Sequence, residues 1–251
     1  MQQNSTDLIA KSAWDATLKY WKEFIVLPFI VTVILCLIQF LVVMQMGENS
    51  KTTLAVSILI TLTLTVFGIA FATAVLKWCA DIFSGKKEID VAEGIKYGLS
   101  RFWGVVGTSL LTTIKIFLWA LLLILPGLYK AVQYSQSVKI SQLEKLSGNK
   151  ANLISQKLIM SVGFLRTLGN IMAIQTVVMV AIYVFIALIY LVGFLLIFIV
   201  PPTPVIIVLG IIVIGASLFA GTFLYVFTNF QYLYYRDEQK TLMAKTKEAL
   251  M

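Results

Sequence analysis

Long runs of apolar residues constrain this chain more than any other feature. The clearest run, Phe24 to Met46, holds no charged residue. As an α-helix it is long enough to cross ~30 Å of hydrocarbon. Similar runs recur along the chain, and 59% of all residues are hydrophobic while 13% are charged, against about 25% charged in soluble domains. A soluble globular enzyme and a disordered chain are therefore excluded, and the sequence predicts a polytopic membrane protein.

The predicted architecture is a single all-α domain over residues 1–251, a transmembrane bundle of about six spans. Hydropathy places five of them at 24–46, 54–76, 103–125, 168–200 and 204–234. The remaining span, a polar helix over 127–143, is predicted from charge. With it, most of the 20 Lys and Arg residues lie on the cytoplasmic side, together with both termini. The alternative for 127–143 is a water-exposed re-entrant or surface helix.

Amphipathic segments precede three of the spans. They cover residues 7–22, 90–101 and 151–165, and each has apolar side chains at helical spacing on one face. Asp90 and Glu93 have the spacing of an N-terminal capping box. We expect three interfacial helices at the membrane surface.

Composition also limits the chemistry. The chain has no histidine, and its two cysteines, Cys36 and Cys79, form no CxxC motif. None of the twelve Asp and Glu residues falls in a predicted span. We therefore predict no catalytic residues, no metal site and no cofactor, and a non-enzymatic protein. The net charge of +8 is explained by membrane topology, so nucleic acid is not an expected partner.

Lys115 is the most unusual residue, because it interrupts an apolar stretch near the middle of the predicted third span. A charge inside a membrane is costly and indicates a functional site by default, although a lysine can also extend its side chain toward the interface. We expect it to join one face of the polar helix in a basic pocket. That candidate pocket comprises Lys115, Lys130, Gln133, Tyr134 and Ser137.

Basic residues near the predicted cytoplasmic interface are candidates for contacts with anionic lipid headgroups. They are Lys11, Lys19, Lys22, Lys86, Lys87, Arg101, Arg166 and Arg236. Between the third and fourth spans, Pro126 and Gly127 break the helix, as a simple turn or as a hinge.

Three short patterns carry a family resemblance. They are Leu125-Pro126-Gly127-Leu128, the Ala-xxx-Ser element from Ala151 to Ser155, and the aromatic stretch from Phe230 to Arg236. In these the chain resembles a group of bacterial six-helix membrane proteins of unknown function, which includes the membrane domain of some glycerophosphodiester phosphodiesterases. The resemblance implies the fold and a bacterial inner (plasma) membrane, but no activity.

The sequence favours a scaffold or accessory subunit of a membrane complex, which contacts anionic lipids and binds partner subunits or further copies of itself. The alternative is a transporter or channel for an anionic or lipid-like substrate, with the basic pocket in its pathway.

Overall fold

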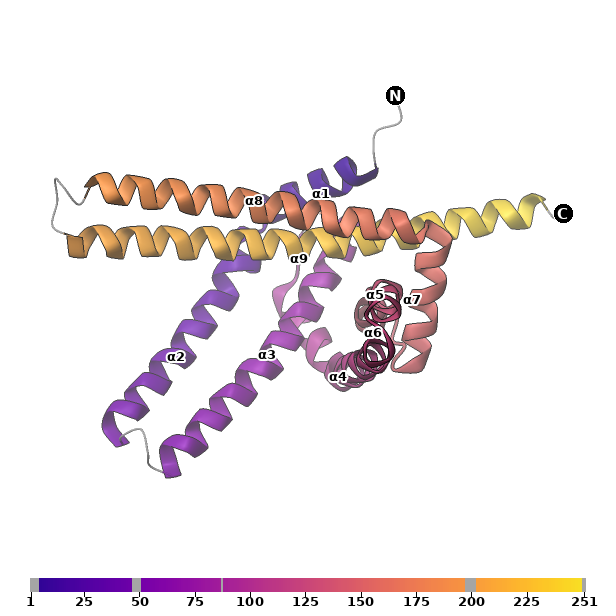
Figure 1. Ribbon diagram of the computed structural model, residues 1–251. Helices are drawn as coiled ribbons and strands as arrows, with labels where there is room; N and C mark the ends of the chain where they lie inside the picture. The colour runs from indigo at the N-terminus through magenta and orange to yellow at the C-terminus, as the bar shows by residue number, and fades with distance from the viewer. Residues whose placement is uncertain (1–4, 47–50, 87, 197–201, 250–251) are drawn as a thin grey trace.

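The computed structural model describes residues 5–46, 51–86, 88–196 and 202–249, and within these ranges the chain is helical, without strands (Figure 1). The elements are α1 (Ser5–Lys19), the π-helical turn η1 (Lys22–Val26), α2 (Leu27–Met46), α3 (Lys51–Phe83), α4 (Val91–Leu122), α5 (Ile124–Gln133), α6 (Ser137–Leu143), α7 (Asn149–Val162), α8 (Phe164–Leu196) and α9 (Pro202–Ala249).

Five of the described helical stretches are long and apolar enough to cross a membrane. They are Lys22–Gln45, Thr53–Phe83, Val91–Leu122, Phe164–Ile189 and Ile212–Thr241. This agrees with the multi-pass helical membrane protein predicted from hydropathy. Residues 197–200 of the predicted span at 168–200 lie outside the described residues. Residues 204–211 of the predicted span at 204–234 precede the last of these five stretches.

One buried core holds the molecule together, and we call it the hub. Here α1, the second half of α3, the first half of α4, α6, α7 and the middle of α9 meet. Large side chains without solvent exposure fill its centre, among them Trp78, Phe227 and Tyr235. The Phe24 ring of η1 stacks on Trp78 at 6.1 Å, so the start of the first span is fixed to the same core.

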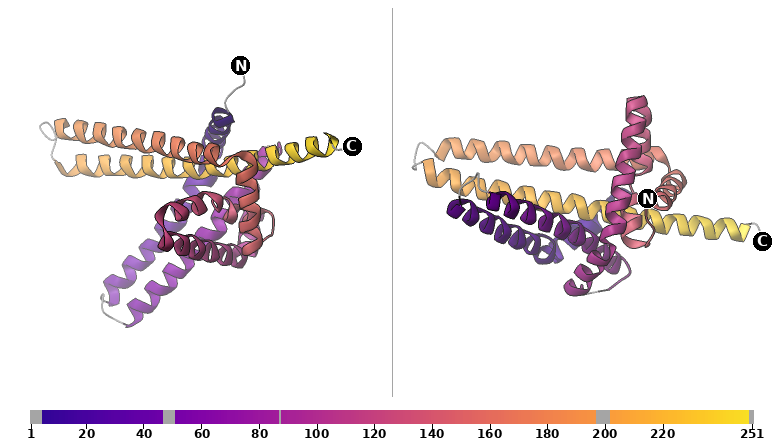
Figure 2. Two further views of the ribbon diagram at one scale, coloured as in Figure 1. Left: turned by 45° about the vertical axis from the view of Figure 1, so that its right-hand side comes forward. Right: turned by 90° about the horizontal axis from the view of Figure 1, so that it is seen from below.

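Three arms leave the hub in different directions (Figures 1 and 2). We define them as α2 with residues 51–69, residues 106–122 with α5, and α8 with residues 202–222. Their surfaces carry large exposed apolar side chains, such as Leu37, Leu62 and Val177. Because lipid tails solvate such side chains as well as a protein core does, this distribution fits a molecule whose arms lie in a membrane.

Two glycines allow α4 to approach α3 closely in the hub. A Cβ atom on Gly98 would lie 2.0 Å from the backbone oxygen of Ala70, and one on Gly94 would lie 2.2 Å from the Trp78 ring nitrogen. The Trp78 Nε1 donates a hydrogen bond of 3.0 Å to the Asp90 carbonyl at the start of α4. The α3–α4 contact therefore depends on small residues at defined positions.

The predicted helix over 127–143 is not continuous. The chain breaks at Leu123, whose backbone is extended, and α5 folds back along α4. Gly127 lies against Ala120, where a Cβ would be 2.7 Å from the Ala120 Cα. Pro126 fits in the first turn of α5, where helix N–H groups lack partners anyway. After a second break at residues 134–136, α6 begins, and neither short helix is among the candidate spans.

Two of the three predicted amphipathic segments remain recognisable as separate elements. Residues 7–22 correspond to α1 and the start of η1, and 151–165 largely to α7, which Gly163 separates from α8 with φ of 109°. The third differs, because 90–101 and the span at 103–125 form one continuous helix, α4. No turn residue between them stops the helix, so the surface segment and the span share one axis.

We predict that Gly98→Ala destabilises the protein by about 1–3 kcal/mol, because the new methyl group overlaps the backbone of α3. Gly107→Ala in the same helix is the matched control, since a Cβ there meets nothing within 4 Å. Thermal unfolding in detergent, followed by tryptophan fluorescence, measures the difference. Equal melting temperatures for the two variants would show that the close α3–α4 approach is not needed.

Candidate functional site

Helix α1 presents three different faces. Ile9, Ala13 and Tyr20 are buried against the hub. Beside this face, Trp14, Leu18 and Trp21 are 47%, 49% and 48% exposed. The Trp14 ring also contacts Phe219 of α9 edge-on at 5.6 Å. Exposed Trp and Leu side chains on a helix fixed next to a span are typical of the membrane–water interface.

The third face carries charges of both signs. Lys11, Asp15 and Lys19 of α1 and Lys22 at the start of η1 are exposed, and the Lys19 Nζ lies 4.9 Å from the centre of the Tyr20 ring. The three lysines are predicted headgroup contacts. Their position next to the exposed Trp and Leu side chains puts basic groups and apolar anchors on one surface.

Most of the other predicted headgroup residues have partners inside the protein. Lys86 pairs with Asp81 at 2.9 Å, Arg166 with Glu238 at 2.7 Å, and Arg236 with Glu144 at 3.2 Å. Arg101 donates to the Ser141 carbonyl at 2.8 Å. Lys87 lies outside the described residues. The basic residues of the hub thus serve first to join helices.

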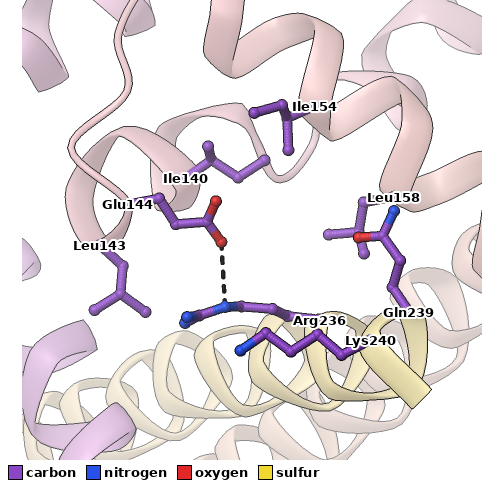
Figure 3. A pocket seen from close by; sticks show the side chains of 8 residues that line it. All are labelled: Ile140, Leu143, Glu144, Ile154, Leu158, Arg236, Gln239 and Lys240. Carbon is purple, nitrogen blue, oxygen red and sulfur yellow. Dashed lines mark ion pairs between the residues drawn. The ribbon is translucent and has the colours of Figure 1, made fainter. Parts of the chain in front are cut away.

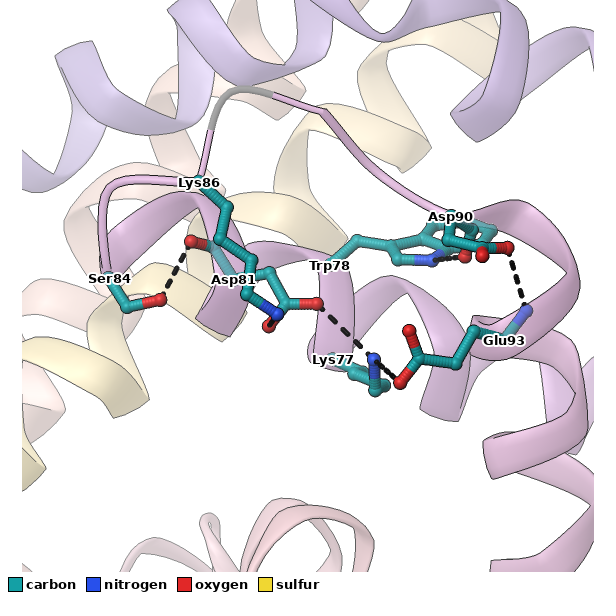
Figure 4. Close-up of polar contacts among 7 residues, drawn as sticks. All are labelled: Lys77, Trp78, Asp81, Ser84, Lys86, Asp90 and Glu93. Carbon is teal, nitrogen blue, oxygen red and sulfur yellow. Dashed lines mark hydrogen bonds and ion pairs between the residues drawn. The ribbon is translucent and has the colours of Figure 1, made fainter.

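A cluster of ion pairs and hydrogen bonds links the end of α3 to the start of α4 (Figure 4). Lys77 pairs with Asp81 at 3.3 Å and with Glu93 at 2.9 Å. The Asp90 carboxylate accepts a hydrogen bond of 2.9 Å from the Glu93 backbone N–H, which is one half of the predicted capping box. The Glu93 carboxylate binds Lys77, so its charge ties α4 to α3.

Four of the five residues of the predicted basic pocket come together. The Lys115 and Lys130 ammonium groups lie 5.9 Å and 5.8 Å from the centre of the Tyr134 ring. Lys130 also donates to Gln133 at 2.9 Å. Burial raises the pKa of the Tyr134 phenol. Ser137 is buried one turn further on, in α6.

Lys115 lies on the side of α4 that contacts α7. Its ammonium donates to the Asn149 side chain at the start of α7. Two threonines on the same face of α4 make parallel bonds: Thr112 donates to Asn152 at 2.8 Å, and Thr108 accepts from the Gly148 N–H at 2.8 Å. The lysine therefore extends a polar contact between α4 and α7, which explains how a charge is tolerated at this depth of α4.

The most deeply placed cation of the hub is Lys139 on α6, which the predicted pocket omitted. Its ammonium donates to the Thr228 carbonyl of α9 and lies near the Cys79 thiol. Although part of the residue reaches the surface, burial of the ammonium lowers its pKa to about 7. Lys139 lies on a different helical face from Lys130 and Tyr134. The predicted pocket comprised the residues of their face only, so it did not include Lys139.

Uncharged polar groups surround Lys139. Gln142 donates to Thr73 of α3 at 3.2 Å, and its side-chain oxygen is buried without a protein partner. Both amide atoms of Asn229 on α9 are buried and have no protein partner either. The polar sequence Thr228-Asn229-Phe230-Gln231 in an otherwise apolar helix is the signal that could have identified this region.

These arrangements favour binding and helix association. In the described part of the chain, His, Cys, Asp and Glu residues form no group of three that could hold a metal ion. The exposed groups include ammonium and guanidinium groups next to aromatic and aliphatic surfaces, together with several carboxylates such as Asp15 and Glu93. The cationic groups recognise anions, above all carboxylates and phosphates.

The lowered pKa of Lys139 predicts a pH-dependent stability. The folded pKa is about 7 and the ordinary value is 10.5, so between these values only the unfolded chain binds the proton. The contribution of Lys139 to stability should therefore rise as pH increases above 7 and be flat below 7. Lys139→Met removes this component, whereas Lys96→Met, at an exposed site on α4, retains it. Melting temperatures between pH 6 and pH 10 test this, and an unchanged pH profile in Lys139→Met would contradict it.

Comparisons of this chain with protein-family models, with curated proteins and with solved structures found no match. The family resemblance based on short sequence patterns therefore stays a prediction.

Proposed function

We propose that this chain is a non-enzymatic integral membrane protein, a scaffold or accessory subunit of a membrane complex that contacts anionic lipids at the cytoplasmic face. The observation that carries the proposal is α1. This helix packs against α9. It and the residues that follow it place Lys11, Lys19 and Lys22 beside the exposed Trp14 and Trp21. Basic groups next to interfacial aromatics attract anionic headgroups.

The scaffold part of the proposal rests on the arms. They diverge from the hub and leave apolar helix surfaces open, for example at Leu41, Leu59 and Leu188. Separate apolar hairpins offer other membrane helices, or second copies of this chain, several surfaces to pack against. The hub holds the arms at fixed positions relative to one another.

The proposed topology puts the hub on the cytoplasmic side of a bacterial inner membrane, with both termini there. Lys77, Lys96 and Arg101 at the hub end of α3 and α4 support this orientation through the positive-inside rule. In this arrangement α5 and α6 together return the chain from the tip of α4 to the hub. They take the place of the sixth span as a broken helix, shielded from lipid by α4 and α7.

A transporter of an anionic or lipid-like substrate is the second candidate. It is favoured by the two lysines, Lys115 and Lys130, that share the Tyr134 ring. Lys115→Met in a vesicle flux assay decides this candidate. Unchanged flux would remove Lys115 from any transport mechanism, and its bond to Asn149 would then be structural.

We predict that Lys22→Gln weakens the preference of the protein for anionic over zwitterionic lipid by roughly fivefold, because each basic residue near the surface contributes about 1 kcal/mol. Reconstitution into vesicles with brominated phosphatidylglycerol, read out by quenching of tryptophan fluorescence, measures this preference. Trp21 is adjacent to Lys22 and exposed, so it reports on that surface.

Lys86→Gln is the matched control, because the Lys86 charge is already paired with Asp81. It should leave the lipid preference nearly unchanged. Equal effects of the two substitutions would argue against α1 as the lipid contact. Purification from native membranes without any retained anionic lipid or stable partner protein would remove the support for the proposed function as a whole.

A further inference from the structure

A pocket of about 360 Å³ opens between α6, α7 and α9 (Figure 3). Its floor is aliphatic and is formed by Ile140, Leu143, Ile154 and Leu158. Its polar side is formed by Glu144, Arg236, Gln239 and Lys240. None of these eight residues belongs to the basic pocket predicted from the sequence.

The polar side of this pocket offers donors to an anion. Arg236 uses its Nε to pair with Glu144 at 3.2 Å, which leaves the terminal Nη groups of the guanidinium for another acceptor. Glu144 is held in place by the Tyr232 hydroxyl, which donates to it at 2.7 Å. In Figure 3, Arg236 and Lys240 extend along the same edge of the pocket, and Gln239 rises from its other end toward Leu158.

The charge balance of the pocket is positive. Its lining has one carboxylate, which is already paired, against the two cations Arg236 and Lys240. Two further lysines, Lys150 and Lys157, are exposed on α7. They lie about one helical turn from Ile154, outside the set of residues that line the pocket.

The place of the pocket along α9 indicates the source of the anion. Arg236 and Lys240 lie in the last turns of the candidate span Ile212–Thr241, and basic residues at the ends of spans lie at headgroup level in membrane proteins. Phosphate is the anion that is abundant at this depth, and the fork of an arginine beside a lysine matches its oxygens. The aliphatic floor suits the uncharged atoms next to a phosphate ester.

We propose that this pocket binds the phosphate of an anionic phospholipid headgroup, with Arg236, Lys240 and Gln239 as donors and the aliphatic floor beneath the adjoining ester atoms. The site rests on the proposed membrane function and adds to it a specific site, separate from the lysines of α1. A free phosphate ester offers the same oxygens, so the two sources have to be distinguished by experiment.

The test uses the full chain in dodecyl maltoside, a detergent without phosphate. Two probes are titrated, dihexanoylphosphatidic acid and inorganic phosphate, and affinity is obtained from the rise in melting temperature with probe concentration. Wild type should bind the short-chain lipid more tightly than inorganic phosphate. Lys240→Gln, at the exposed rim, should weaken lipid binding roughly tenfold.

A double variant, Glu144→Gln with Arg236→Gln, removes both members of the ion pair and leaves no unpaired charge. It should lose at least as much affinity as Lys240→Gln while it still unfolds cooperatively. Lys96→Gln, at an exposed site on α4, is the control with the same change of charge as Lys240→Gln. It should bind the short-chain lipid like wild type.

Several outcomes would overturn the proposal. If neither probe stabilises wild type, or if the pocket variants bind like wild type, the pocket does not hold phosphate. Equal affinity for both probes would assign it to a soluble phosphate ester, and cross-linking of Lys240 to an acidic partner protein would assign it to that protein. In each case a reduced preference of Lys22→Gln for anionic vesicles would still leave the proposed function standing.

Discussion

The close contact of α3 with α4 and α9 in the hub is the constraint on which the rest of the structure depends. Three long apolar arms cannot be positioned by their own surfaces, because lipid solvates those surfaces equally well in any arrangement. The arms are positioned where Trp78 fills the core and Gly98 allows α4 to touch the backbone of α3. Directional polar bonds, such as that of Trp78 to the Asp90 carbonyl, then fix the register.

Cations of the hub and of the α4 arm form ion pairs or hydrogen bonds according to the groups near them. Where a helix leaves the apolar region, carboxylates are available, and Lys77 and Arg236 form ion pairs. Among the described contacts, Lys115 of the arm and Lys139 of the hub bond instead to a side-chain amide and a backbone carbonyl. A lysine without a carboxylate partner is costly to keep charged, which is why burial lowers the pKa of Lys139.

The sequence predicted those features that follow from local periodicity. The apolar helices long enough to span a membrane and the Asp90 cap both depend on residues within a few turns of each other. It did not predict that 127–143 divides into α5 and α6. That break depends on the fit of Gly127 against Ala120 and of polar α6 side chains into the hub, and both are contacts between distant segments.

The sequence by itself determined that this chain lies in a membrane. Its apolar residues are too many for one soluble core, and none of its acids falls in a predicted span. It also determined which side chains are polar enough to matter. Only the tertiary structure decided how they are used, since pairing depends on distance. It joined Arg236 to Glu144 and Lys115 to Asn149, and it left Lys11 and Lys22 exposed beside the interfacial tryptophans.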